Sequence, residues 1–111
     1  MTFKPACTLD DIWEGDMTEV EVDGRPILLV WPEGGEIRAF QGICPHQDIP
    51  LVEGKFDGRT VMCRAHQWTF DAKSGEGVNP KDCRLASYPV RIEGEIVLVS
   101  TEGVAALFAH T

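Results

Sequence analysis

Two cysteines and two histidines stand in two short groups that could bind a metal. Cys44 and His46 are separated by one residue; after sixteen further residues come Cys63 and His66, which are separated by two. Two thiolates and two imidazoles can hold a 2Fe–2S cluster in which histidine replaces cysteine on one iron. The same four donors can hold zinc in a tetrahedral site. The choice between these metals decides the function.

The spacing of the four residues favours an iron–sulfur cluster over zinc. A common zinc pattern of this composition places two cysteines together and then two histidines together on a helix. Here each group brings one cysteine and one histidine, so each could give its thiolate to one iron and its imidazole to the other. Zinc remains the less favoured alternative. Two structural disulfides are less favoured still, because they would leave both histidines without a role.

The chain has two further cysteines, Cys7 and Cys83, that this ligand set does not need. We expect Cys7 to follow a first strand and Cys83 to follow a turn at Asn79-Pro80. A disulfide between them is disfavoured in a reducing compartment. Both are expected to be small, partly buried apolar side chains.

The sequence around the four candidate ligands resembles the Rieske family. It is most similar to the ferredoxin components of bacterial toluene monooxygenases, of the toluene 4-monooxygenase and toluene/o-xylene monooxygenase type. The similarity runs over nearly the whole chain, and the stretch from Arg64 to Phe70 narrows it to this branch. The stretches that carry it are Cys44-Pro45-His46-Gln47, Cys63-Arg64-Ala65-His66, Trp68-Thr69-Phe70, residues 75–80, Asp82-Cys83 and Tyr88-Pro89-Val90.

This resemblance implies an electron carrier that is a component of an enzyme and not the catalyst. Its one 2Fe–2S cluster would be held by Cys44, His46, Cys63 and His66. The implied electron donor is an NADH-dependent flavin and iron–sulfur reductase, and the implied acceptor is a diiron hydroxylase that oxidises an aromatic hydrocarbon. The alternatives are the ferredoxin of an aromatic ring-hydroxylating dioxygenase and, from another class, a nitrite reductase small subunit or a zinc-bound structural module.

The resemblance also assigns roles to residues around the cluster. Trp68 and Phe70 align with a serine and a tyrosine whose hydroxyls raise the potential of respiratory Rieske proteins. We therefore expect a potential at the low end of the Rieske range, roughly −150 mV. Trp68 is expected to pack over the cluster, with a partner contact as the alternative. A loop containing Gly75, Gly77 and Pro80 would cover the cluster, unless it is an ordinary surface turn.

Composition and charge agree with a small carrier. A chain of 111 residues is one domain, and its formal charge of −8 argues against nucleic acid or an anionic membrane as partner. No apolar run is long enough to span a bilayer and no signal peptide opens the chain, so we expect a soluble, cytoplasmic protein. The acidic charge would suit steering towards basic patches on other proteins, and it would equally serve solubility.

The sequence pattern predicts that antiparallel β-strands position the candidate ligands. Short apolar runs separated by turn residues predict an all-β sandwich or small barrel, with a cluster-binding subdomain from about residue 41 to 83. The one helix candidate runs from Leu9 to Trp13, with Thr8 as N-cap. The predicted hairpins join 19–22 to 27–31 through Asp23-Gly24, 55–56 to 60–62 through Asp57-Gly58, and 90–92 to 96–99 through Glu93-Gly94, with a further strand at 37–40.

Overall fold

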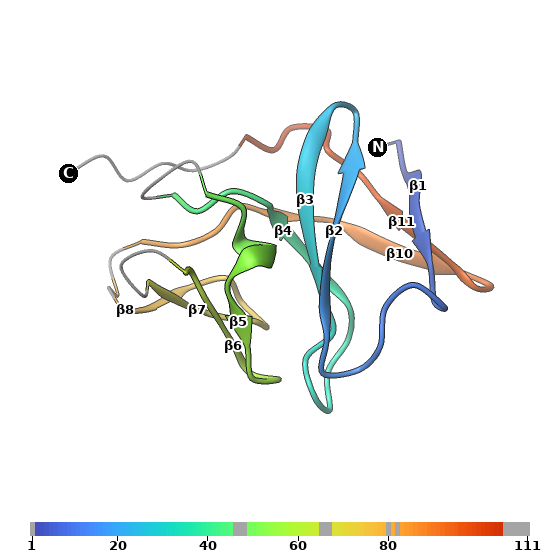
Figure 1. Ribbon diagram of the computed structural model, residues 1–111. Helices are drawn as coiled ribbons and strands as arrows, with labels where there is room; N and C mark the ends of the chain where they lie inside the picture. Colours follow the sequence, from blue (N-terminus) through green and yellow to red (C-terminus); the bar gives the residue numbers. More distant parts are fainter. Residues whose placement is uncertain (1, 46–48, 65–67, 80, 82, 106–111) are drawn as a thin grey trace.

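Antiparallel strands make up the computed structural model, which describes residues 2–45, 49–64, 68–79, 81 and 83–105 (Figure 1). The predicted all-β class is confirmed. Among these residues no helix is long and apolar enough to cross a membrane. The elements are β1 (Lys4–Thr8), β2 (Met17–Val22), β3 (Arg25–Val30), β4 (Arg38–Gln41), the 3-10 turn η1 (Leu51–Glu53), β5 (Lys55–Phe56), β6 (Thr60–Met62), β7 (Thr69–Asp71), β8 (Gly77–Asn79), β9 (Ser87–Tyr88), β10 (Val90–Glu93) and β11 (Ile96–Val99).

These strands form three sheets. The sheet orders are β1-β11-β10, β2-β3-β4-β9 and β5-β6-β7-β8, and every pairing is antiparallel. All three predicted hairpins are present. At the first of them, Asp23 and Gly24 both have positive φ, 55° and 74°, as the tightest two-residue hairpin turn requires.

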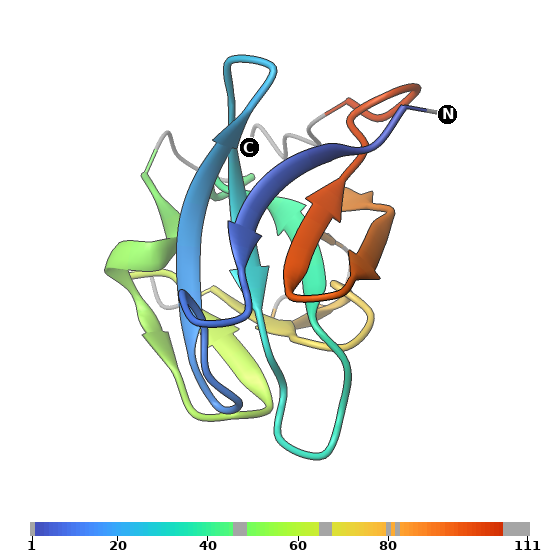
Figure 2. The ribbon, with the colours of Figure 1, turned by 90° about the vertical axis from the view of Figure 1, so that its right-hand side faces the viewer.

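Strand β3 lies in the middle of the molecule and separates two cores. Successive side chains of a strand point to opposite faces. Accordingly Ile27 and Leu29 pack with Val97 and Val99, while Leu28 and Val30 pack on the opposite side. Figures 1 and 2 show the sheet of β3 standing between the β5–β8 sheet and the sheet of β1, β10 and β11. The apolar run at β3 is continuous because both of its faces are buried.

The helix predicted at the start of the chain is wrong. Residues from Leu9 onwards form a turn, in which the N–H of Asp11 donates to the carbonyl of Thr8 at 3.0 Å. The Asp11 carboxylate also accepts hydrogen bonds from the N–H and the hydroxyl of Thr8, at 2.9 and 3.2 Å. Such local side-chain bonds compete with helix formation, and here they close the turn.

Two further placements differ from the prediction. Cys7 lies within β1 and not after it, because its partner strand β11 extends the pairing to Thr8. Of the predicted loop at 75–80, Gly77 to Asn79 is strand β8, since Gly75 with φ +79° turns the chain back so that it pairs with β7. Pro80 lies outside the described residues.

Candidate metal centre

Both candidate cysteines begin loops that are closed in the same way. The N–H of Cys44 donates to the carbonyl of Ile49 at 3.0 Å, and the N–H of Cys63 donates to the carbonyl of Trp68 at 2.8 Å. Each loop therefore returns to its own start after five residues. By sequence, the first contains His46 and the second contains His66, and both histidines lie outside the described residues. Two of the four predicted ligands are thus placed by the structure.

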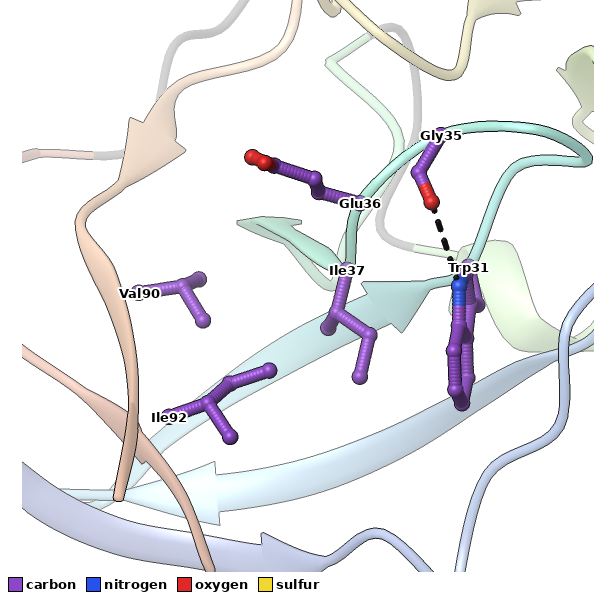
Figure 3. Close-up of a pocket in the computed structure, with 6 residues that line it drawn as sticks. All are labelled: Trp31, Gly35, Glu36, Ile37, Val90 and Ile92. Carbon is purple, nitrogen blue, oxygen red and sulfur yellow. Dashed lines mark hydrogen bonds between the residues drawn. The ribbon is translucent and has the colours of Figure 1, made fainter. Parts of the chain in front are cut away.

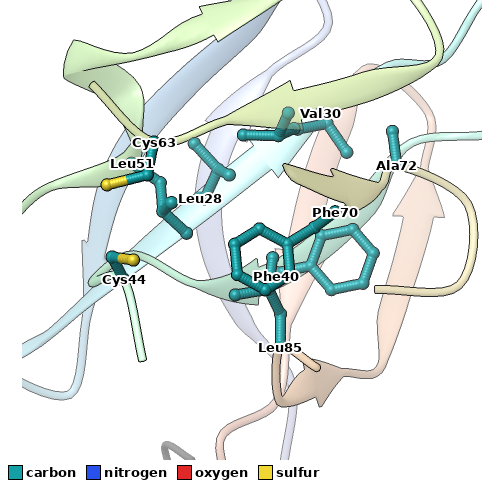
Figure 4. Packing of buried hydrophobic residues seen from close by; sticks show 10 residues of the cluster. Leu28, Val30, Phe40, Cys44, Leu51, Cys63, Phe70, Ala72 and Leu85 are labelled. Carbon is teal, nitrogen blue, oxygen red and sulfur yellow. The ribbon is translucent and has the colours of Figure 1, made fainter. Parts of the chain in front are cut away.

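The two cysteines lie together at one end of a buried apolar core. Each is 1% exposed, and both belong to the core that includes Leu51 and Phe70. Figure 4 shows their sulfur atoms at the same end of this core, beside Leu51 and away from Ala72. None of the four cysteines of the chain, all of which the structure describes, forms a disulfide.

This setting fits a metal group. The thiolate is the form of cysteine that binds metal, and burying an unpaired thiolate in apolar surroundings is costly. Two buried cysteines brought side by side by separate loops are therefore suited to share a metal group. Within the described part of the chain no three Cys, His, Asp or Glu side chains group closely enough to hold a metal ion, and that part contains only the cysteine half of the predicted set.

Different backbone pairings hold the two loops in place. The second loop is the tip of the β6–β7 hairpin, where Met62 pairs with Thr69. The first loop has no such strands, and an isolated bridge between Ile43 and Pro50 closes its base. Beside that bridge, the N–H of Leu51 donates to the carbonyl of Gly42 at 2.8 Å.

The turn η1 connects the two loops. Its last residue, Glu53, forms an ion pair with Arg64, which follows Cys63, with 2.7 Å between Oε1 and Nε. The next residue, Gly54, lies so close to β6 that a Cβ there would be 1.9 Å from the carbonyl oxygen of Met62. The first loop thus leads into a turn that is packed directly on the strand that ends at Cys63.

The side chains beneath the loops exclude water from the cysteines. Phe70 is fully buried in the same core, and Trp68 is partly buried against it. The packing of Trp68 over the cluster stays a prediction. Sequence reasoning overlooked Gln41, a buried polar residue at the end of β4. Its only local signal is a polar residue placed directly after the apolar pair Ala39-Phe40.

A separate hollow lies on the other side of the β2–β3–β4–β9 sheet and is no part of the centre. Figure 3 shows Ile37, Val90 and Ile92 facing one another there, and the indole N–H of Trp31 donating to the carbonyl of Gly35 at 3.2 Å. None of the residues that line it is a candidate ligand.

Comparison with known proteins decides which metal group the chain carries. Residues 2–89 match the model of the Rieske [2Fe-2S] domain. The chain belongs to the Rieske family. This Rieske ferredoxin carries one 2Fe–2S cluster, which takes up and releases single electrons, and it is an electron-transfer component and not a catalytic subunit.

Its relatives are ferredoxins of multicomponent oxygenases. The chain is 44% identical over 102 residues to the ferredoxin component of the alkene monooxygenase system of Xanthobacter autotrophicus, covering 90% of this chain and 82% of the relative. It is 38% identical over 98 residues to the ferredoxin component of the naphthalene 1,2-dioxygenase/salicylate 5-hydroxylase systems of a Ralstonia species, covering 87% and 93%. Among solved structures, the ferredoxin of carbazole 1,9a-dioxygenase from Nocardioides aromaticivorans superposes with a TM-score of 0.80 at 27% identity, covering 90% and 98%.

Proposed function

We propose that Cys44, His46, Cys63 and His66 bind the cluster, within a subdomain of about residues 41–83 in a single domain that spans residues 1–111. The support is the shared burial of the two cysteines at the bases of two equal loops, each of which contains one histidine in its sequence. Two thiolates and two neutral imidazoles leave an oxidised cluster uncharged, so it accepts an electron more readily than a four-cysteine cluster does.

The electron acceptor that we propose is the diiron hydroxylase of a monooxygenase that acts on aromatic hydrocarbons of the toluene type. The electron donor would be an NADH-dependent flavin and iron–sulfur reductase, and the site of action the cytoplasm. The observation that carries this proposal is the 44% identity to an alkene monooxygenase ferredoxin over 90% of the chain. The toluene branch is favoured by the stretch from Arg64 to Phe70.

A second candidate acceptor is the oxygenase of an aromatic ring-hydroxylating dioxygenase. It is favoured by the 38% identity to a naphthalene dioxygenase ferredoxin and by the likeness to the carbazole dioxygenase ferredoxin. Either acceptor would take single electrons from the same cluster. The two candidates therefore differ only in the acceptor protein to which the ferredoxin docks.

Reconstitution separates these two candidates. The purified ferredoxin is combined with an NADH-dependent reductase and with either a toluene-type diiron hydroxylase or an aromatic-ring dioxygenase, and NADH-dependent product formation is measured. We expect turnover at least about tenfold faster with the diiron hydroxylase, the ratio that ~1.4 kcal/mol of preferential recognition produces. Ferredoxin stripped of its cluster is the control and should support no turnover. Faster turnover with the dioxygenase would assign the chain to the second candidate.

A further inference from the structure

The side chain of Gln41 joins the first ligand loop to a segment 45 residues away. Gln41 is the last residue of β4 and is 1% exposed. Its Nε2 donates to the carbonyl of Ile43 at 2.8 Å, and its Oε1 accepts from the N–H of Ala86 at 2.8 Å. The amide orientation is fixed by its partners, because a carbonyl only accepts and an N–H only donates.

On the Ala86 side, the amide completes a rung of the sheet. The β4–β9 ladder pairs Ala39 with Tyr88 and Phe40 with Ser87, so the next pair is Gln41 with Ala86. The N–H of Gln41 donates to the carbonyl of Ala86 at 2.9 Å, as in a regular rung. In a regular ladder the N–H of Ala86 would donate to the main-chain carbonyl of Gln41. Here it donates to the side-chain Oε1 of Gln41 instead. The backbone of Gln41 is thereby able to leave the sheet and enter the loop.

On the Ile43 side, the amide supplies a hydrogen-bond donor to the loop. The bonds from Cys44 to Ile49 and from Leu51 to Gly42 flank the pair of Ile43 and Pro50. In a pair flanked in this way, the residue's own carbonyl points away from the opposing chain. The carbonyl of Ile43, one peptide before Cys44, is held by Gln41.

We propose that Gln41 is a positioning residue for the cluster: its amide fixes the peptide before Cys44 against the Ala86 segment and so sets where the Cys44 sulfur meets the iron. The proposal rests on the ligand role of Cys44 proposed above. Among natural side chains of this length, only glutamine presents a donor and an acceptor together without charge. Leucine offers neither, and methionine, which keeps the length of the side chain, also lacks both a strong donor and a strong acceptor.

The test compares Gln41→Leu and Gln41→Met with the matched control Thr101→Val. Thr101 is 8% exposed, and its hydroxyl donates to Asp23 at 2.6 Å in the part of the molecule that packs away from the ligand loops. Its replacement by valine also removes one side-chain hydrogen bond at nearly constant volume. Three quantities are measured: the EPR g-values of the reduced cluster, the rate of cluster loss to an iron chelator, and the urea midpoint.

We expect both Gln41 variants to shift the g-values and to lose the cluster about tenfold faster or more, since the part-buried carbonyl of Ile43 is left without this donor. Thr101→Val should lower the urea midpoint while the g-values and loss rate stay unchanged. If Gln41→Leu does not fold, Gln41→Met, which keeps the length and flexibility of the side chain, is decisive. Wild-type g-values and loss rate in a Gln41 variant would overturn the positioning role. A Cys44→Ser variant that retained a wild-type cluster would instead overturn the ligand assignment.

Discussion

The four cysteines differ in where they pack and in how deeply they are buried. Cys7 packs against the core beyond the central sheet, where burial, and then the Asp11 carboxylate, raise the pKa of its thiol. A raised pKa disfavours the thiolate, which is the form of cysteine that binds metal. Cys83 packs partly against the same core as Cys44 and Cys63, and its carbonyl accepts from the N–H of Gly77 at 2.7 Å. Its role in the structure is that of a part-buried side chain beside the centre.

Serine substitutions of the two buried cysteines test their proposed role as ligands. Cys44→Ser and Cys63→Ser should each lose most of the bound iron and visible absorbance, and with them thermal stability, because the ligand bonds are part of the folding free energy. Cys7→Ala and Cys83→Ala are the controls and should keep two irons and two sulfides per chain, as measured by iron and acid-labile sulfide analysis. Loss of the cluster in either control would mean that the ligand set is misassigned.

Residue type and spacing predict Cys44 and Cys63 as ligands, and the structure buries both in one core, but sequence reasoning could not predict Gln41. Cysteines spaced in this way from histidines are typical of a cluster with mixed cysteine and histidine ligands. The role of Gln41 depends on Ala86 arriving beside it, which is a consequence of the β4–β9 pairing. No local pattern encodes that contact, so the sequence shows only a polar residue next to an apolar pair.

At the level of elements, local turn chemistry predicted the hairpins well. Asp23-Gly24 and Asp57-Gly58 each join two strands as expected, because positive φ at such positions fixes the return of the chain. Elements that depend on contacts between segments were missed. The turn η1 was not predicted, since its position follows from packing Leu51 under the ligand loops and Gly54 on β6.

The contact of Gly54 with β6 gives a prediction at this level. Gly54 has φ −86°, which is outside the left-handed region, so Gly54→Ala is opposed chiefly by close contacts. The added Cβ would lie 1.9 Å from the carbonyl oxygen of Met62 and 3.2 Å from that of Leu51. Neither backbone can yield without moving η1 or the strand that leads into Cys63. We expect Gly54→Ala to lower the free energy of unfolding by about 1–3 kcal/mol and to accelerate chelator-induced cluster loss.

Gly94→Ala provides the matched control. Gly94 lies in the β10–β11 turn, has φ +62°, and has no atom within 4 Å of an added Cβ. Its replacement should cost ~1–2 kcal/mol through backbone conformation alone. The two variants would then have similar urea midpoints but different rates of cluster loss. Equal rates of cluster loss would show that η1 does not support the second ligand loop.

The whole molecule is arranged around the β2–β3–β4–β9 sheet. One core packs this sheet against the β5–β8 sheet together with Cys44 and Cys63, and the other packs it against β1 and β11. The apolar run at β3 is continuous in the sequence because each face of this strand lies in one of the two cores. Pairings between distant segments, such as β1 with β11, determine which strands cover each face of this sheet. No local sequence signal specifies these pairings.

Segments close to the two ends of the described chain meet at the tip of the β2–β3 hairpin. The Asp23 carboxylate accepts hydrogen bonds from Lys4 in β1 and from Thr101 beyond β11. Arg25, on the other side of the turn, donates to the carbonyl of Val104. One hairpin tip therefore ties strand β1 and the segment after β11 to the central sheet.

This tie should make stability depend on pH. The hydrogen bonds from Lys4 and then Thr101 lower the pKa of Asp23 below its ordinary value of 3.8. A lowered folded-state pKa means that the stabilisation is complete above pH 3.8 and is lost as the pH falls towards the folded-state pKa. Asp23→Asn, which tolerates the positive φ of this position, should therefore be less stable than wild type at pH 6. The difference should shrink below pH 3.8.

Urea unfolding of wild type and variants between about pH 6 and pH 2.5 measures this difference, since carboxylates common to both chains cancel. Lys4→Met removes the largest cause of the pKa shift while leaving Asp23 able to ionise. Lys4→Met should abolish most of the pH dependence of the stability that Asp23 contributes. In the double variant, Asp23→Asn should then lower the stability little further, because the two residues act as one pair. A gap between wild type and Asp23→Asn that stayed constant over this pH range would show that the hairpin tip holds the two end segments by shape and not by the charge of Asp23.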